Sequence, residues 1–172
     1  MILWGISLCS FLTIALSMEH LEVNFYVKYL LQGIAETIGE GAAAALFVKI
    51  NPRLIFSVSF ALMIIGGGGL AYCDVARPDI ILVYIFEVIA ILGASMAYCG
   101  VFVSTPLMFS TAVAGTCTGF CNMTGLTAQI FAPFISAFTA PIPMGTFTTM
   151  SLIGLITAQF IKKMTDEVIP TS

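Results

Sequence analysis

The chain is built from apolar runs close to 20 residues long that are separated by short polar segments. A run of about 20 apolar residues is what an α-helix needs to cross the hydrocarbon core of a bilayer. Hydrophobic residues make up 59 % of the 172 residues and charged residues only 9 %. A water-soluble domain of this size could not shelter so much apolar surface. The sequence therefore predicts an all-α membrane protein.

Six membrane spans can be drawn, which predicts a six-helix transmembrane bundle over residues 1–163 and a polar cytoplasmic tail over residues 164–172. Residues 1–17 are interpreted as the first helix and not as a signal peptide, because no basic segment precedes the apolar run. No charged residue occurs between Gly100 and Phe160, so prolines divide the last two spans. The predicted spans are 2–18, 24–48, 54–72, 80–99, 106–138 and 145–161.

Four prolines decide the fifth and sixth spans. Pro106 suits the first turn of a helix, which places the start of the fifth span there. Pro133 predicts a kink or an end within that span, and the Pro141-Ile142-Pro143 segment predicts a clear break before the sixth span.

The distribution of Lys and Arg predicts the orientation, because short cytoplasmic loops carry an excess of these residues. With a cytoplasmic amino terminus, the cytoplasmic side holds Lys49, Arg53, Lys162 and Lys163. Arg77 would then lie outside, and Lys28 near the outer end of the second span. An even number of spans also places both termini on one side, so both are predicted to be cytoplasmic.

Three glutamates, Glu36, Glu40 and Glu87, lie inside predicted spans. A charged side chain in hydrocarbon is costly unless it faces a cavity or a partner, so each one is a candidate functional residue. Glu40 lies nearer to the cytoplasmic end of its span, where a carboxylate is ordinary. Lys28 is expected to extend its ammonium group outward to the membrane surface.

Polar residues recur at helical spacing on three of the spans, which predicts a polar stripe on each. In the second span they are four residues apart, and residues at i and i+4 share a helix face with a slow rotation along the helix, so they form one slanting stripe. Such faces are expected to converge on a common interior. The alternative is that these groups only hydrogen-bond across packed helices. The stripes comprise Lys28, Gln32, Glu36 and Glu40; Tyr84, Glu87, Ser95 and Tyr98; and Thr111, Thr118, Asn122 and Gln129.

From these stripes we predict a solute or coupling site formed by Glu36, Glu87, Gln32, Asn122 and Tyr84. Gly115 and Gly119, four residues apart, are expected to allow another helix to approach the fifth span closely. The third span has few polar groups and a run of glycines at 66–69, so it is expected to face lipid or to pack tightly.

Several functional classes find no support in the sequence. None of the motifs GxSxG, HExxH or the P-loop occurs, so no catalytic residue, cofactor or metal site is predicted and the chain is not expected to be an enzyme. The five cysteines have no metal-binding spacing. Six Lys and Arg residues without a basic cluster predict no binding to nucleic acid.

Two segments resemble parts of major facilitator superfamily transporters. The stretch 116–123, followed by Ile130-Phe131-Ala132-Pro133, looks like the eleventh helix of that family. The segment Lys49-Ile50-Asn51-Pro52-Arg53 is similar to the basic loop between its eighth and ninth helices. The chain as a whole thus resembles the carboxy-terminal six-helix half of such a transporter, nearest to the sugar and organic-ion branch. It departs from the acidic, proline and arginine pattern with which the family's eleventh helix opens, having there Leu107, Ser110, Thr111 and Ala114.

The resemblance implies transport of a small solute, organic ion or sugar-like, by alternating access around a site between two halves. The second half would be part of the same protein, missing, or another copy of the chain. Spans one, two, four and five would line the cavity, spans three and six would be peripheral, and the plasma membrane is the default location. The expected partners are the lipid bilayer and the solute. The alternatives are a non-transporting membrane subunit that acts as a scaffold and a truncated transporter fragment.

Overall fold

The computed structural model describes residues 1–17, 25–47, 50–76, 80–110, 112–139 and 141–160. Over these ranges the protein is all-α and contains no β-strand. The helices are α1 (Ile2–Ser17), α2 (Phe25–Phe47), α3 (Pro52–Ala76), α4 (Ile80–Met108), α5 (Ala114–Gln129), α6 (Ala132–Ser136) and α7 (Ile142–Gln159).

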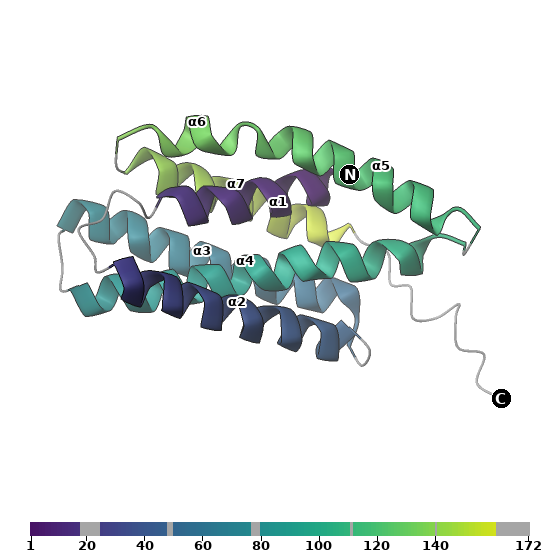
Figure 1. Cartoon of the computed structure of the whole chain (residues 1–172), viewed down its shortest axis with the longest axis horizontal. Helices are drawn as coiled ribbons and strands as arrows, with labels where there is room; N and C mark the ends of the chain where they lie inside the picture. The colour runs from purple at the N-terminus through teal and green to yellow at the C-terminus, as the bar shows by residue number, and fades with distance from the viewer. Residues whose placement is uncertain (18–24, 48–49, 77–79, 111, 140, 161–172) are drawn as a thin grey trace.

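Helix α4 is the centre of the bundle, because it packs on α1, α2, α3 and α5. Helix α3 also packs on α7, and α1 packs on α5, α6 and α7. Helix α2 packs mainly on α4 and makes a smaller contact with α3. Figure 1 shows α2 along one side of the bundle, with α5 and α6 along the opposite side. The outer helices α2 and α5 are therefore both attached to α4.

The predicted positions of the first four helices are confirmed, apart from the end of α4. Helices α1 and α2 agree with the predicted spans to within one residue at each end. Helix α4 begins at Ile80 as predicted but continues to Met108, so Pro106 lies in its last turn and does not open the next helix. Because proline has no N–H, the carbonyl oxygen of Phe102 receives no hydrogen bond from residue 106, and the helix ends two residues later.

The prediction of one long helix over residues 106–138 is wrong. Helix α5 begins only at Ala114, and Ile130 and Phe131 separate it from the short helix α6. Pro133 lies in the first turn of α6, so the predicted end near this proline is confirmed. The predicted break at Pro141–Pro143 is also confirmed in position, since α7 begins at Ile142 with Pro143 in its first turn.

Two helical segments of the described residues, Pro52–Ala76 and Ile80–Leu107, are long and apolar enough to cross a membrane. The apolar segment Ile2–Leu16 is shorter, and at about 1.5 Å per residue it falls below a hydrocarbon core of about 30 Å. Helix α2 is long enough but carries Lys28, Glu36 and Glu40. The six-span topology and the cytoplasmic termini stay predictions. The predicted tail at 164–172 lies outside the described residues.

Glycines bring α3 and α4 into backbone contact. A Cβ atom added to Gly66 would lie 2.5 Å from the backbone nitrogen of Ala90, and one added to Gly93 would lie 2.7 Å from the carbonyl oxygen of Ser59. Each glycine thus faces the backbone of the other helix. Of the two expectations for the third span, tight packing is the one found here.

The expected close approach at Gly115 and Gly119 is wrong for this bundle. Both residues are exposed, and a Cβ atom added to either would meet nothing within 4 Å. The close contact of α5 lies further along, at Gly125, where an added Cβ would be 2.9 Å from the Leu8 side chain of α1. The helix therefore turns Gly125, and not Gly115 or Gly119, toward its neighbour.

A buried hydrogen bond joins α1 to the end of α4. Trp4 Nε1 donates to Thr105 Oγ1 at 2.8 Å, and Thr105 Oγ1 donates to the carbonyl oxygen of Val101 at 2.6 Å. The Trp4 ring packs edge-on against Phe102, with ring centroids 4.5 Å apart. Extending α4 through Pro106 thus positions Thr105 to accept the indole N–H.

Replacing Thr105 with valine should lower the free energy of unfolding by about 1–3 kcal/mol, because the buried Trp4 N–H loses its acceptor. Trp4 is the only tryptophan, so its fluorescence during denaturant titration reports both stability and local environment. Thr149→Val is the control, since Thr149 is exposed and its hydroxyl donates to Gly145 of its own helix. Equal effects of the two changes would contradict this role for Thr105.

Candidate functional site

The predicted stripe on α2 turns from the core to the surface along the helix. Lys28 is only 4 % exposed, Gln32 and Glu36 are half-buried, and Glu40 is exposed. A row of residues four apart advances by about 40° at each step, because the helix has 3.6 residues per turn. The expectation that Lys28 extends to the membrane surface is therefore wrong, since this residue lies in the core.

Glu87 lies in the first third of α4 and is 2 % exposed. Its carboxylate interacts electrostatically with the ammonium group of Lys28 on α2, and its Oε1 atom accepts no hydrogen bond from the described residues. Lys28 and Glu87 are the only buried charged side chains in the part of the chain that the structure describes. The two opposite charges lie between α2 and α4, in the interior of the bundle.

Small residues explain why these two helices lie close enough for the charges to interact. A Cβ atom added to Gly39 would lie 2.7 Å from Ser95 Oγ and 3.0 Å from the carbonyl oxygen of Leu92. Further along, Gly100 lies against the Phe47 ring, 3.0 Å from its added Cβ. Small residues let helix backbones approach, which here keeps α2 against α4 over its length.

The contact between α2 and α4, which contains Lys28 and Glu87, forms a seam through the bundle. The other predicted site residues lie at the edges of this seam or away from it. Gln32 Nε2 donates to Glu36 Oε1 at 2.9 Å, so these two side chains are paired on α2 itself. Tyr84 is half-buried on α4, three residues before Glu87 and on the same face. Asn122 is half-buried on α5, which packs on α1 and α4 and not on α2. The expected convergence of all three stripes on one interior is wrong, because α2 and α5 lie on opposite sides of the bundle (Figure 1).

Most described hydroxyl groups on the helices bond to their own helix. Thr118 Oγ1 donates to the carbonyl oxygen of Ala114 at 2.8 Å, and Ser95 Oγ donates to that of Ile91 at 2.5 Å. Such bonds satisfy the hydroxyl without any neighbour. The alternative expectation, hydrogen bonds across packed helices, therefore fails for Thr118 and Ser95, which belong to two of the stripes.

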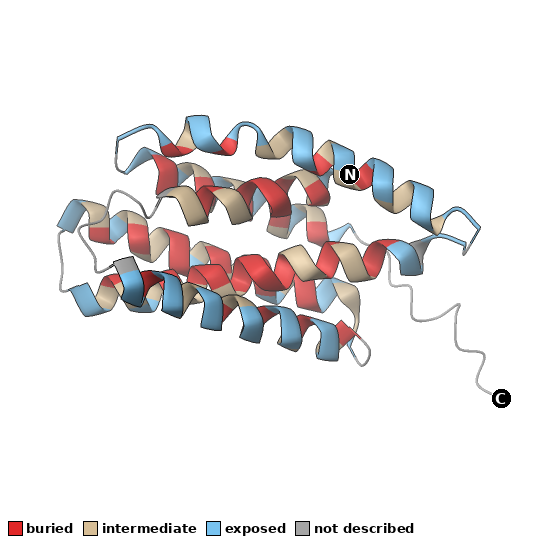
Figure 2. Ribbon diagram, in the orientation of Figure 1, coloured by how far each residue is buried: buried red, intermediate tan, exposed pale blue. Residues whose placement is uncertain are grey.

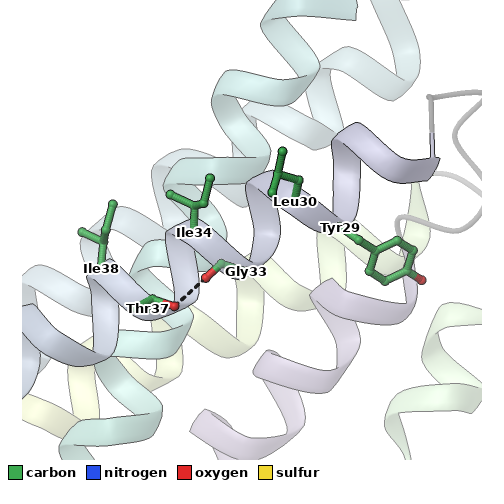
Figure 3. A pocket seen from close by; sticks show the side chains of 6 residues that line it. All are labelled: Tyr29, Leu30, Gly33, Ile34, Thr37 and Ile38. Atoms are coloured by element: carbon green, nitrogen blue, oxygen red, sulfur yellow. Dashed lines mark hydrogen bonds between the residues drawn. The ribbon is translucent and has the colours of Figure 1, made fainter.

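A groove of about 380 Å³ lies on the outer face of α2 and is lined by Tyr29, Leu30, Gly33, Ile34, Thr37 and Ile38. Figure 3 shows Leu30, Ile34 and Ile38 in a row along the helix, with Tyr29 pointing away from them. The Thr37 hydroxyl donates to the carbonyl oxygen of Gly33 at 2.8 Å. None of the predicted site residues lines this apolar groove, so it is not the predicted solute site.

The position of Lys28 could have been inferred from the small residues of α2. Ala35, Gly39 and Ala43 follow Lys28 at intervals of seven and four, and all are buried. This row marks the face that packs on α4, whereas the regular four-residue row of polar side chains rotates away from it. Of the residues in the polar stripe, only Lys28 lies on the face of α2, marked by the row of small residues, that packs on α4.

No protein-family model matches the chain, and searches of curated proteins and of solved structures return no significant match. The resemblance to facilitator transporters stays a prediction. The site is therefore defined by its geometry alone: a buried lysine and a buried glutamate between the central helix α4 and the outer helix α2.

Proposed function

We propose that the chain is a multi-pass membrane protein that forms one half of a secondary transporter for a small solute, completed by a second six-helix bundle. The observation that carries the proposal is that charged side chains lie inside the bundle and apolar ones outside, which is the reverse of a water-soluble protein. The described bundle buries Lys28 and Glu87 while large apolar side chains cover its outside. Figure 2 shows the exposed outer face along α2 and along α5 and α6.

The apolar exterior favours lipid as the surroundings. Water-soluble monomers rarely expose contiguous apolar patches larger than a few hundred Å². Here exposed large apolar residues occur on each of the longer helices, and α3 and α4 also have the length and composition of membrane spans. Examples are Leu30, Ile34 and Ile38 on α2; Ile65 and Tyr72 on α3; Ile81 and Ile85 on α4; Phe120, Met123 and Leu126 on α5; and Ile153 and Ile156 on α7.

Transport is the function that best accounts for the buried charges. Ionisable residues within membrane helices are costly, and they commonly belong to ion or substrate pathways. Glu87 lies on the helix that contacts four others, whereas α2 is attached mainly through α4. A proton or cation that neutralises Glu87 would weaken its attraction to Lys28. The position of α2 against α4 would then depend on occupancy, as alternating access requires.

A membrane scaffold is the second candidate, and a specific observation favours it. The charge of Glu87 already faces an opposite charge, Lys28, within the same bundle. In a scaffold the two charges would compensate each other, and no solute or ion would have to bind to them. The pair would then only fix the position of α2 along α4. The two candidates differ in whether Glu87 is needed for solute movement or only for folding.

Replacing Glu87 with glutamine should reduce solute uptake roughly tenfold or more, because a lost interaction with a charged group is worth about 1.5–3 kcal/mol. Glu40→Gln, at an exposed position of α2, should leave uptake unchanged. Glu36→Gln should have a smaller effect than Glu87→Gln, since Glu36 is half-buried and bonded to Gln32. The measurement is uptake of radiolabelled tetraethylammonium and of glucose by proteoliposomes across a pH series.

Membrane insertion is checked first, by resistance of the expressed chain to alkaline extraction. Equal amounts of folded protein are compared for every variant, so that a folding defect is not counted as lost transport. Uptake that is the same in the wild type and in Glu87→Gln at every pH would exclude a transport role for Glu87, whereas no uptake by the wild type would favour the scaffold.

A further inference from the structure

A second pocket lies where the first turns of α3 meet the last turn of α7. It has a volume of about 240 Å³ and is lined by Asn51, Arg53, Leu54, Ser57 and Gln159. The packing of α3 on α7 brings these residues together although Arg53 and Gln159 are 106 residues apart. None of them belongs to the predicted solute site, and the pocket is separate from the groove on α2.

Hydrogen bonds hold the Arg53 side chain in one orientation. Its Nε and Nη2 atoms both donate to Gln159 Oε1, at 3.1 and 2.6 Å. Gln159 Nε2 in turn donates to Ser57 Oγ at 2.9 Å, and Ser57 Oγ donates to the carbonyl oxygen of Arg53 at 2.8 Å. The guanidinium group is thus positioned by a neutral amide, which leaves its positive charge uncompensated by Gln159.

The free donors of Arg53 suit a phosphate group. A guanidinium has five N–H donors in a planar fork, and such a fork binds phosphate oxygens in pairs. Arg53 is exposed and lines the pocket, so donors that do not point to Gln159 are accessible. An immobilised guanidinium also loses less side-chain entropy on binding than a mobile one.

The sequence next to the pocket residues is basic. Lys49 precedes Arg53 by four residues, and Lys162 and Lys163 follow Gln159 by three and four. Four of the six Lys and Arg residues therefore lie at or near the two chain segments that form the pocket. Basic pockets between membrane helices on the cytoplasmic side bind anionic lipid headgroups.

We propose that this pocket binds the phosphate of an anionic phospholipid headgroup, with Arg53 as the principal ligand and Gln159 as the residue that positions it. The proposal rests on the membrane embedding in the proposed function and is independent of transport. Bound lipid would join the start of α3 to the end of α7 at the membrane surface.

The test measures lipid retention by native mass spectrometry of the purified full chain, released from nanodiscs of phosphatidylglycerol and phosphatidylcholine. The wild type should retain phosphatidylglycerol in preference to phosphatidylcholine. Arg53→Gln should reduce that retention at least tenfold, and Arg53→Lys, which keeps the charge without the fork, should reduce it severalfold. Arg77→Gln is the matched control, because it removes the same charge beyond the opposite end of α3.

Each other outcome would overturn the proposal. Equal losses in Arg53→Gln and Arg77→Gln would mean general attraction of anions and no built site. Full retention by Arg53→Gln would exclude Arg53 as a ligand, and displacement by millimolar inorganic phosphate would identify free phosphate as the occupant. If Arg53→Gln does not fold, Arg53→Lys decides, since unchanged retention by that variant excludes recognition by the fork. Removal of the wild-type chain from membranes by alkaline buffer would instead refute the membrane embedding on which the proposed function rests.

Discussion

Replacing Gly66 with alanine should destabilise the bundle by about 1–3 kcal/mol, the usual cost of inserting a carbon atom into a well-packed interior. The added Cβ atom would lie 2.5 Å from the backbone nitrogen of Ala90 and 2.7 Å from its Cα atom. Backbone atoms cannot rotate away as the end of a side chain can, so α3 and α4 would have to separate. The measurement is the free energy of unfolding of the purified chain, from the loss of Trp4 fluorescence during titration with dodecyl sulfate.

The same helix supplies a matched control for this prediction. Gly68 lies two residues further along α3, and a Cβ atom there would meet nothing within 4 Å. Gly68→Ala should keep or slightly raise stability, since alanine is the better helix former by about 0.5–1 kcal/mol. Gly93→Ala should reproduce the loss, because its Cβ would lie 2.7 Å from the carbonyl oxygen of Ser59 on α3. A destabilisation by Gly68→Ala as large as that by Gly66→Ala would contradict the packing argument.

The sequence predicted the helices well where their ends are marked by charged or polar residues. The start of α2, the end of α3 and the start of α4 lie beside such residues, and each was located to within a few residues. Between Gly100 and Phe160 no charge marks a boundary, and there the prediction failed. Pro106 favours the first turn of a helix, yet it lies in the last turn of α4. Local preferences alone could not choose between these two positions.

The candidate site was predicted only in part, and the reason is geometric. Glu87 was identified from its charge in an apolar run, which is a local property of the sequence. The sequence does not identify its partner, because the position of Lys28 near the end of its span predicts an ammonium group that extends to the membrane surface. The rotation of about 40° per step along a row of residues four apart places Lys28 in the core and Glu40 at the surface. Which of these residues faces α4 depends on where the small residues Ala35 and Gly39 pack.

Helix packing also explains why α5 contributes less to the site than expected. Glu87 lies on the side of α4 that packs against α2. Asn122 on α5 could therefore lie close to Glu87 only if α5 and α2 packed on the same face of α4. Instead α2 and α5 lie on opposite sides of the bundle (Figure 1). Contacts between helices distant in sequence are not encoded in the periodicity of either helix, so this arrangement could not be predicted from the stripes.

Replacing either Lys28 or Glu87 alone with methionine should destabilise the bundle by about 3–5 kcal/mol, because the remaining charge would stay buried after the opposite charge across the α2–α4 contact is removed. Lys28 is 4 % exposed and Glu87 2 % exposed, and each belongs to a different helix of the seam. The double variant Lys28→Met with Glu87→Met removes both charges and keeps similar side-chain volumes. Its free energy of unfolding should be close to that of the wild type. The loss should therefore be far smaller than the sum of the losses caused by the two single changes.

The double-mutant cycle measures this coupling directly, from the free energies of unfolding of the four proteins in the same detergent. We expect a coupling energy of several kcal/mol, because the double variant should recover most of what the two single changes lose. Glu40→Met is the control, since Glu40 is exposed on the same helix and should show no coupling to Glu87→Met. Additive effects of Lys28→Met and Glu87→Met would mean that the two charges do not stabilise each other. The solute-uptake assay can then be applied to the double variant, because a pair needed only for folding would leave it active, whereas a coupling residue would not.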